Sequence, residues 1–359
     1  MRLATLTAAL CAISLLAATG SALGDRGKKA RRHAQKNDAG PDPAPTAMVV
    51  DLHVDVPWQV HWKGRAPTLP EGDARLSALQ AGGVGGLVFP IYLPDKAHED
   101  GAHLDDAEAT YATIQAIVAA SPVFLPLGST RAEAGRITSF LSIEGAGAFA
   151  ADPPAIDRFI ARGVRLISPA HAKNTAFSAS ATGEPVGFGL TALGKAFCAR
   201  IYDHGALVDV SHVSDAAFAD IAAIARAHGA PVVATHSNAR ALARHPRNLT
   251  DDQLRVIGET GGVAGLNFHS PFVTTSGKAT IDDVVKQALH MVKVAGVDHV
   301  ALGSDFDGGI RAAAGLEDAS RYPRLSEALV RHGMSAGDVT KIFATNALRV
   351  LGWAPAKAP

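Results

Sequence analysis

Cysteine is almost absent from this sequence, in which only Cys11 and Cys198 occur among 359 residues. Aromatic residues reach 6% and charged residues 19%, whereas apolar residues make up 47%. This composition excludes a disulfide-rich scaffold and a disordered chain, and it supports a large buried core. Stability must therefore come from the core and from any bound metal.

An excess of charge of one sign is also lacking, because 34 Lys and Arg residues balance 34 Asp and Glu residues. Seven of the basic and two of the acidic residues precede residue 41, so residues 41–359 hold 27 basic against 32 acidic side chains. A mildly acidic body makes nucleic acid a poor candidate as a partner.

Long apolar runs are missing except at the N-terminus, where one extends from Leu3 to Ala18 after Arg2. Small residues follow it, so residues 1–24 are predicted to be a cleaved secretory signal, with a retained anchor as the alternative. Residues 25–47 are basic and rich in Pro, which predicts a flexible leader. We therefore expect an exported protein, periplasmic or secreted, that has no membrane span after cleavage. Only Cys198 then remains, which excludes an intramolecular disulfide.

From residue 48 onward, short apolar runs alternate with longer Ala-rich stretches of helical spacing. This alternation indicates repeated strand and helix units around a parallel sheet. Eight such runs predict strands at 48–53, 85–92, 137–144, 164–170, 206–212, 231–237, 261–268 and 299–305. Helices are predicted at 105–120, 155–163, 191–205, 215–229 and 281–296, several of which end on Gly. The fold class expected for residues 48–359 is α/β, a single (β/α)₈ TIM barrel.

Ionisable residues gather at the carboxyl ends of these predicted strands, which converge on one face of such a barrel. The first strand ends in Asp51-Leu52-His53-Val54-Asp55, where alternation lets His53 and Asp55 reach one metal ion together. The third ends in Glu144, whose two carboxylate oxygens can bridge two ions.

The fifth and sixth strands end in His212 and His236, which suit a second zinc ion beside the first. A structural His or Asp held by hydrogen bonds is the usual alternative, but it would have to apply independently at four strand ends. Asp305, after the eighth strand, can exchange a proton with a metal-bound water, whereas Asp307 is interpreted as a turn residue.

Three residues outside the strands complete the candidates. His171 follows the fourth strand and can polarise a scissile carbonyl or stabilise its oxyanion. Arg247 lies in the loop after His236 and can hold a terminal carboxylate with two hydrogen bonds. Thr250 belongs to an Asn-Leu-Thr glycosylation pattern, but it precedes Asp251-Asp252-Gln253 and is better interpreted as a helix N-cap.

Taken together, these motifs resemble the membrane (renal) dipeptidases, peptidase family M19 of the amidohydrolase superfamily. The resemblance runs from about Val50 to Leu351 and rests on DLHVD, LQAGGVGGLVFPIY, SIEGA, HAKNT, DVSHVS, THSNARALARHPRNLTDD, LGSDFDGG and KIFATNALRVL. The sequence departs from the animal enzymes at Leu52 and Val54, where they carry Gly and Asn, and it lacks their cysteines and lipid-anchor tail.

The resemblance implies two Zn²⁺ ions. It implies that His53 and Asp55 bind one ion, that His212 and His236 bind the other, and that Glu144 bridges them. It further implies that Asp305 handles the proton, that His171 supports the tetrahedral intermediate and that Arg247 contacts the substrate carboxylate. Asp305 and His171 would thus be catalytic, and His171 and Arg247 substrate-binding.

The resulting hypothesis is a zinc-dependent hydrolase of peptide bonds, in which a hydroxide bridging both ions attacks the carbonyl of a dipeptide. The family resemblance extends the expected substrates to dipeptides with a C-terminal D-residue. The alternatives are another amidohydrolase reaction, such as deacylation of N-acyl amino acids, and a non-catalytic binding protein. The expected partner is a small-molecule dipeptide, and a homodimer is the assembly considered.

Overall fold

The computed structural model describes residues 48–129 and 135–352. The predicted signal 1–24, the leader 25–47 and the last seven residues lie outside the described residues. Within the described part, no helix is both long and apolar enough to cross a bilayer.

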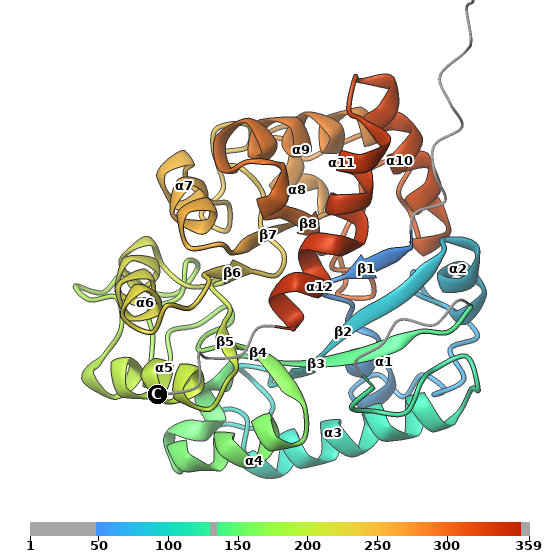
Figure 1. Cartoon of the computed structure of the whole chain (residues 1–359). Helices are drawn as coiled ribbons and strands as arrows, with labels where there is room; N and C mark the ends of the chain where they lie inside the picture. The colour runs from blue at the N-terminus through green and yellow to red at the C-terminus, as the bar shows by residue number, and fades with distance from the viewer. Residues whose placement is uncertain (1–47, 130–134, 353–359) are drawn as a thin grey trace, which may run out of the picture. The chain divides into compact units, whose positions relative to one another are not determined.

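Eight parallel strands form the wall of a barrel, and helices surround it (Figure 1). The strands are β1 Val49–Asp51, β2 Val84–Tyr92, β3 Thr138–Glu144, β4 Val164–Ser168, β5 Leu207–Val208, β6 Val233–Ala234, β7 Val263–Leu266 and β8 Val300–Leu302. Their order in the sheet is β5-β4-β3-β2-β1-β8-β7-β6. A parallel bridge between Asp209 and Val233 joins the two end strands. The predicted TIM barrel is confirmed.

The helices occupy the outer ring. They are α1 Val56–His61, α2 Leu76–Ala81, α3 Leu104–Ala119, α4 Ile156–Ala161, α5 Ala192–Asp203, α6 Asp215–Ala227, α7 Asp251–Glu259, α8 Ser270–Val273, α9 Ile281–Ala295, α10 Tyr322–Arg331, α11 Ala336–Thr340 and α12 Asn346–Leu351. Short 3-10 turns cover Ala146–Ala150, Pro153–Ala155, Val297–His299 and Ala319–Arg321, and a π-helical turn, Lys341–Thr345, joins α11 to α12. Apolar side chains from strands and helices form one continuous core.

Several local predictions are confirmed at the ends of the helices. Thr250 is the N-cap of α7, and its hydroxyl accepts a hydrogen bond from the backbone N–H of Gln253 at 3.2 Å. Gly205 and Gly229, just past α5 and α6, have φ angles of 80° and 59°. A residue without Cβ adopts these left-handed angles at little cost, so the chain can leave the helix and return to the barrel wall.

The strand boundaries needed correction, because all the observed strands except β2 are shorter than the predicted ones. The predicted run 206–212 is paired as a strand only over Leu207–Val208, and the run 231–237 only over Val233–Ala234. The ladder therefore ends before the polar residues begin, and His212 and His236 stand in loops just beyond it.

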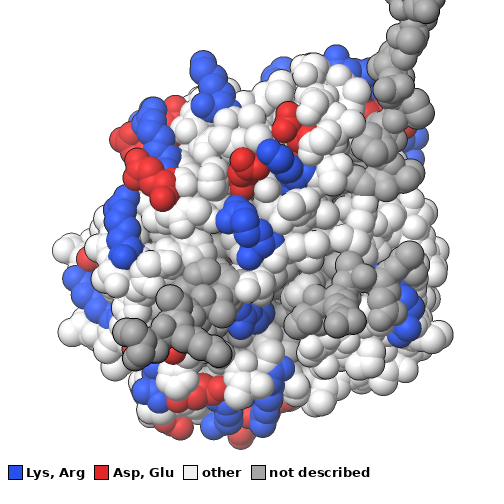
Figure 2. Space-filling model, viewed as in Figure 1, with Lys and Arg blue, Asp and Glu red and all other residues white. Residues whose placement is uncertain are grey.

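Charged side chains of both signs are interspersed on the face shown in Figure 2.

Candidate metal centre and active site

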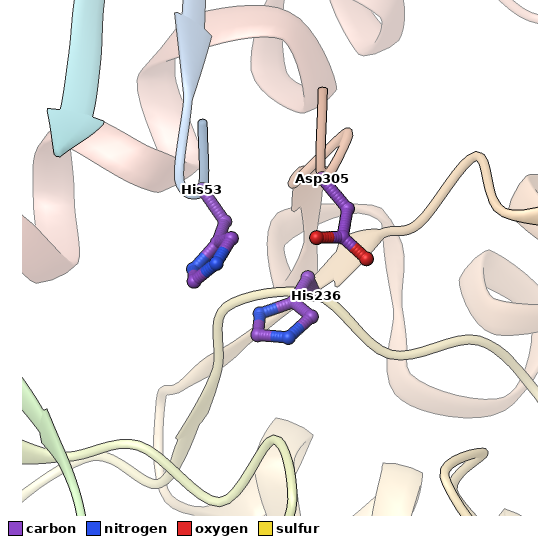
Figure 3. Close-up of side chains that lie close together, drawn as sticks. All are labelled: His53, His236 and Asp305. Carbon is purple, nitrogen blue, oxygen red and sulfur yellow. The ribbon is translucent and has the colours of Figure 1, made fainter. Parts of the chain in front are cut away.

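Residues from five strand ends meet at one end of the barrel. His53 follows β1, Glu144 is the last residue of β3, His212 and His236 follow β5 and β6, and Asp305 follows β8. Figure 3 shows His53, His236 and Asp305 pointing toward one another from three separate elements. Asp55, at the N-cap of α1, is buried beside them. The five predicted metal ligands and Asp305 are thus brought together.

The distances place Glu144 at the centre of this cluster. Its Oε2 lies 3.6 Å from His53 Nε2, and its Oε1 lies 2.9 Å from His212 Nε2 and 3.6 Å from His236 Nε2. Asp55 Oδ2 lies 3.4 Å from His53 Nε2. One oxygen of Glu144 therefore faces the His53 and Asp55 pair, and the other faces the two remaining imidazoles.

The donor set fits metal ions. Ligand atoms of His53, Asp55 and Glu144, and those of Glu144, His212 and His236, lie within 4.8 Å of one another in each group. Nε2 of His53, which faces Asp55 and Glu144, is buried without a hydrogen-bond partner among the described residues. Because burying such a polar atom unpaired is costly, this nitrogen is suited to coordinate an ion.

The electrostatics also favour a cation here. Burial lowers the pKa of His53, but the carboxylates of Glu144 and Asp55 outweigh it and hold the pKa well above its usual value. Burial, followed by the positive charge of Arg247, holds the pKa of His212 well below its usual value. His212 is thus neutral, the form that binds metals, while the two carboxylates stabilise positive charge at His53, which a bound metal ion would supply in place of the proton.

A hydrogen-bonded chain fixes the orientation of His236. The Thr235 hydroxyl donates to Asp209 Oδ2 at 2.6 Å and lies 2.7 Å from His236 Nδ1. Since its hydrogen points to Asp209, the Thr235 oxygen accepts the Nδ1–H of His236. The Nε2 lone pair of His236 therefore faces the cavity, which is how partners behind a metal-binding histidine set its tautomer.

Asp51 anchors the ends of β1 and β8 beneath the site. Its carboxylate accepts the backbone N–H of His53 at 2.9 Å and that of Ser304 at 3.0 Å, and also the hydroxyl of Tyr322. Because one buried carboxylate ties down the backbone beside both His53 and Asp305, it fixes the distance between these two side chains.

Asp305 occupies an unusual backbone conformation, with a φ angle of 67°. Aspartate tolerates this left-handed region better than most residues, and here it turns the carboxylate toward the cluster. Its Oδ2 accepts a hydrogen bond from Asn267 Nδ2 at 2.9 Å. Burial, with a further contribution from Asp55, raises the pKa of Asp305 to about 7.

Asp307 adopts a φ angle of 65°, as its interpretation as a turn residue requires. Its carboxylate, however, is buried and structural. It accepts the backbone N–H groups of Asp73 and Ala74 at 3.0 and 3.2 Å, and it pairs with Arg65 at 2.9 Å. Asp307 thus holds the loop that carries Asp305 against the segment between α1 and α2.

A cavity of about 250 Å³ opens onto the cluster and includes His171 and Arg247 in its lining. His171 Nδ1 lies 3.2 Å from Asp95 Oδ2, and Arg247 Nη2 lies 3.1 Å from His212 Nε2. The guanidinium group is buried at the cavity, so it is placed to receive a negatively charged group. Both predicted substrate contacts therefore face the same space as the predicted ligands.

Known proteins of similar sequence identify the class of this site. Residues 44–358 match the profile of the membrane dipeptidase family, Peptidase family M19. The chain belongs to peptidase family M19. It is 31% identical over 347 residues to "Dipeptidase ataJ" of Aspergillus terreus, a match that covers 84% of this chain and 83% of that protein. The predicted family and the assignment to the metallo-dipeptidase class of enzymes are both confirmed.

Two solved M19-like structures agree with this family assignment. A metallopeptidase from Rhodobacter sphaeroides, liganded with a phosphinate mimic of the dipeptide L-Ala-D-Ala, is 27% identical with a TM-score of 0.76. The match covers 85% of this chain and 98% of that one. The family M19 metallopeptidase "dipeptidase AC" is 28% identical with a TM-score of 0.77, over 86% of this chain and 99% of that one.

Sequence reasoning missed several residues that shape the cavity of this M19 chain. Tyr92 and His269 line it directly, and Asp95 and Asn267 hold His171 and Asp305. Tyr92, Asn267 and His269 all stand at or just beyond the carboxyl end of a strand. The rule that located the ligands would have found these three. Asp95 lies three residues after the end of β2, as His269 does after β7, so the rule indicates Asp95 as well, although its contact with His171 could not be predicted because it joins two separate loops.

Proposed function

We propose that this chain is an exported zinc-dependent dipeptidase whose cavity holds two Zn²⁺ ions. In this proposal His53 and Asp55 hold one ion, His212 and His236 hold the other, and Glu144 bridges both. The observation that carries it is the position of Glu144, with one carboxylate oxygen facing each group of ligands in a member of a metallo-dipeptidase family. Bound zinc would supply a water of lowered pKa and a Lewis acid toward the scissile carbonyl.

The remaining residues position and protonate the substrate. Arg247 binds the C-terminal carboxylate, His171 donates a hydrogen bond to the carbonyl oxygen as negative charge develops on it, and Asp305 carries a proton to the departing amine. Asn267 holds the Asp305 carboxylate in place by donating to its Oδ2. All three groups line one cavity of about 250 Å³, whose small size favours a short substrate with a free carboxylate.

A D-residue on the C-terminal side belongs to the same proposal. Its support is the Rhodobacter sphaeroides metallopeptidase, 27% identical to this chain and liganded with a mimic of L-Ala-D-Ala. Export is supported only by the pattern of residues 1–24. The test is to fuse these residues to a reporter enzyme and to measure whether the reporter is secreted.

A substrate panel tests the proposed activity. Zinc-loaded protein should hydrolyse L-Ala-L-Ala and L-Ala-D-Ala. Tri-alanine and N-acetyl-alanine should be poor substrates. Tri-alanine holds its amine and its carboxylate one residue farther apart than a dipeptide does, and N-acetyl-alanine has no free amine. Release of alanine is measured by chromatography. Faster hydrolysis of N-acetyl-alanine than of every dipeptide would show that the enzyme is a deacylase instead.

Arg247→Ala should impair recognition of the substrate carboxylate. Since a charge-assisted hydrogen bond contributes about 1.5–3 kcal/mol, KM for L-Ala-L-Ala should rise by roughly 10- to 150-fold, with a smaller change in kcat. The decisive measurement compares this dipeptide with its C-terminal amide. The wild-type enzyme should prefer the free acid, and the variant should lose that preference. An unchanged preference would remove Arg247 from carboxylate binding.

A further inference from the structure

A second group of histidines and carboxylates lies outside the active-site cavity. Residues 95–106, which run from the loop after β2 into the first turn of α3, have the sequence DKAHEDGAHLDD. We name this segment the β2–α3 loop. It contains two histidines and five carboxylates, Asp95, Glu99, Asp100, Asp105 and Asp106, but a single cationic residue, Lys96. Such an excess of negative charge around two imidazoles favours the binding of a cation.

The two imidazoles of this loop lie face to face. The ring centroids of His98 and His103 are 4.5 Å apart, with 19° between the ring planes. His98 Nε2 lies 2.9 Å from Asp106 Oδ2, and His103 Nε2 lies 2.8 Å from Asp100 Oδ1. One ring nitrogen of each histidine and one oxygen of Asp106 fall within 4.8 Å of one another.

The backbone of the loop holds these groups in place. Asp106 lies in the first turn of α3 and accepts the backbone N–H of His103 at 2.7 Å, which ties the start of the helix to the second histidine. Reciprocal hydrogen bonds between His98 and Gly101, at 3.2 and 3.3 Å, close the turn between the two histidines. His98 and His103 are therefore brought together by the fold of the loop itself.

We propose that His98, His103 and Asp106 form a further binding site for a divalent transition-metal ion, with Zn²⁺ as the ion expected to fill it. Two imidazoles and a carboxylate are donors that zinc prefers, whereas calcium and magnesium favour oxygen ligands alone. Asp100 contacts Nε2 of His103, which leaves Nδ1, the nitrogen that faces the backbone of Asp106 at the start of α3, as the one offered to an ion.

The proposed ligand atoms lie near the spacing that an ion requires. Tetrahedral zinc with bonds of about 2.0 Å places its ligands roughly 3.3 Å apart, and these atoms lie within 4.8 Å of one another. The side chains of His98 and His103 are 44% and 51% exposed, so small shifts of the rings toward an ion displace no core side chain. None of the three residues lines the active-site cavity, so the ion would bind independently of those in the catalytic cluster.

Zinc counting on the full chain tests this site. The double variant His98→Gln, His103→Gln is compared with wild type by equilibrium dialysis against zinc chloride up to about 100 times the enzyme concentration, followed by elemental analysis. The control is His204→Gln, which removes an equally exposed histidine that contacts a carboxylate, Asp157, at 3.5 Å. Hydrolysis of L-Ala-L-Ala by the double variant shows that it is folded.

Wild type and His204→Gln should each bind one more Zn²⁺ per chain than the double variant, whatever number the cavity retains. Equal stoichiometry in all three proteins would overturn the proposal. A second measurement needs no variant. Saturating zinc should slow the modification of His98 and His103 by diethyl pyrocarbonate at least several-fold, as followed by peptide mass spectrometry. An unchanged rate would also overturn it.

Discussion

Asp305→Asn should lower kcat for dipeptide hydrolysis by about 10²- to 10⁴-fold, the range typical of a lost general acid or base. The substitution keeps the shape of the side chain and the left-handed backbone that Asn also tolerates. It removes only the ability to accept and release a proton beside the cluster. Steady-state kinetics with L-Ala-L-Ala measure the effect, and elemental analysis should find the same zinc content as in wild type.

Asp307→Asn is the matched control for this experiment, because Asp307 has nearly the same φ angle two residues along the same loop. Its carboxylate contacts backbone N–H groups and Arg65 rather than the cavity. The control should lose stability but retain kcat within about tenfold of wild type, since no proton transfer is removed. Full activity of Asp305→Asn would exclude the proposed role, and an equal loss in both variants would attribute the effect to the loop.

Removal of metal by a chelator should abolish hydrolysis, and addition of Zn²⁺ should restore it. It should also destabilise the fold, because the carboxylates of Asp55 and Glu144 lose the cations that compensate them. An ion present at 1,000 times its Kd stabilises the native state by about 4 kcal/mol. With an unfolding entropy of about 2.1 cal/mol/K per residue, a domain of roughly 300 residues shifts by about 1.5 °C per kcal/mol, so each such ion should raise Tm by about 6 °C.

Calorimetry with and without chelator measures the expected decrease in Tm. Glu144→Ala provides the control, since it removes the carboxylate shared by both ligand groups and should make Tm insensitive to chelator. Persistent hydrolysis by protein from which elemental analysis finds all metal removed would contradict metal dependence. Recovery with Mg²⁺ but not with Zn²⁺ would contradict the proposed ion.

The sequence pattern predicted the barrel and the ligand cluster because both depend on local features. Apolar runs mark the buried strands, and the polar residues that close each run must lie at the carboxyl end of the barrel. The same logic places His53, Glu144, His212, His236 and Asp305 without any knowledge of their distances. The structure brings these residues together at one cavity.

The supporting contacts escaped prediction because they join distant segments. Asp307 accepts a hydrogen bond from the backbone of Asp73, which lies 234 positions away in the sequence. No local pattern near either residue predicts this contact. The helices α10 to α12 were also missed, since no strand follows them to mark a repeating unit. Strand lengths were overestimated for a related reason. Leu207–Val208 and Val233–Ala234 end where the barrel wall stops, and the mostly polar residues that close the predicted runs, 209–212 and 235–237, lie in the loops beyond.

The proposed ligands are spread along the chain, with His53 near the first strand and His236 after the sixth, while Asp305 follows the last. During synthesis from the ribosome, the first ligands emerge some 250 residues before Asp305 does. A nascent or truncated chain therefore holds only part of the proposed catalytic set. If these residues act as proposed, hydrolysis begins only after the final strand closes the barrel, and we expect an unfinished copy of this enzyme to be inert toward the dipeptides around it.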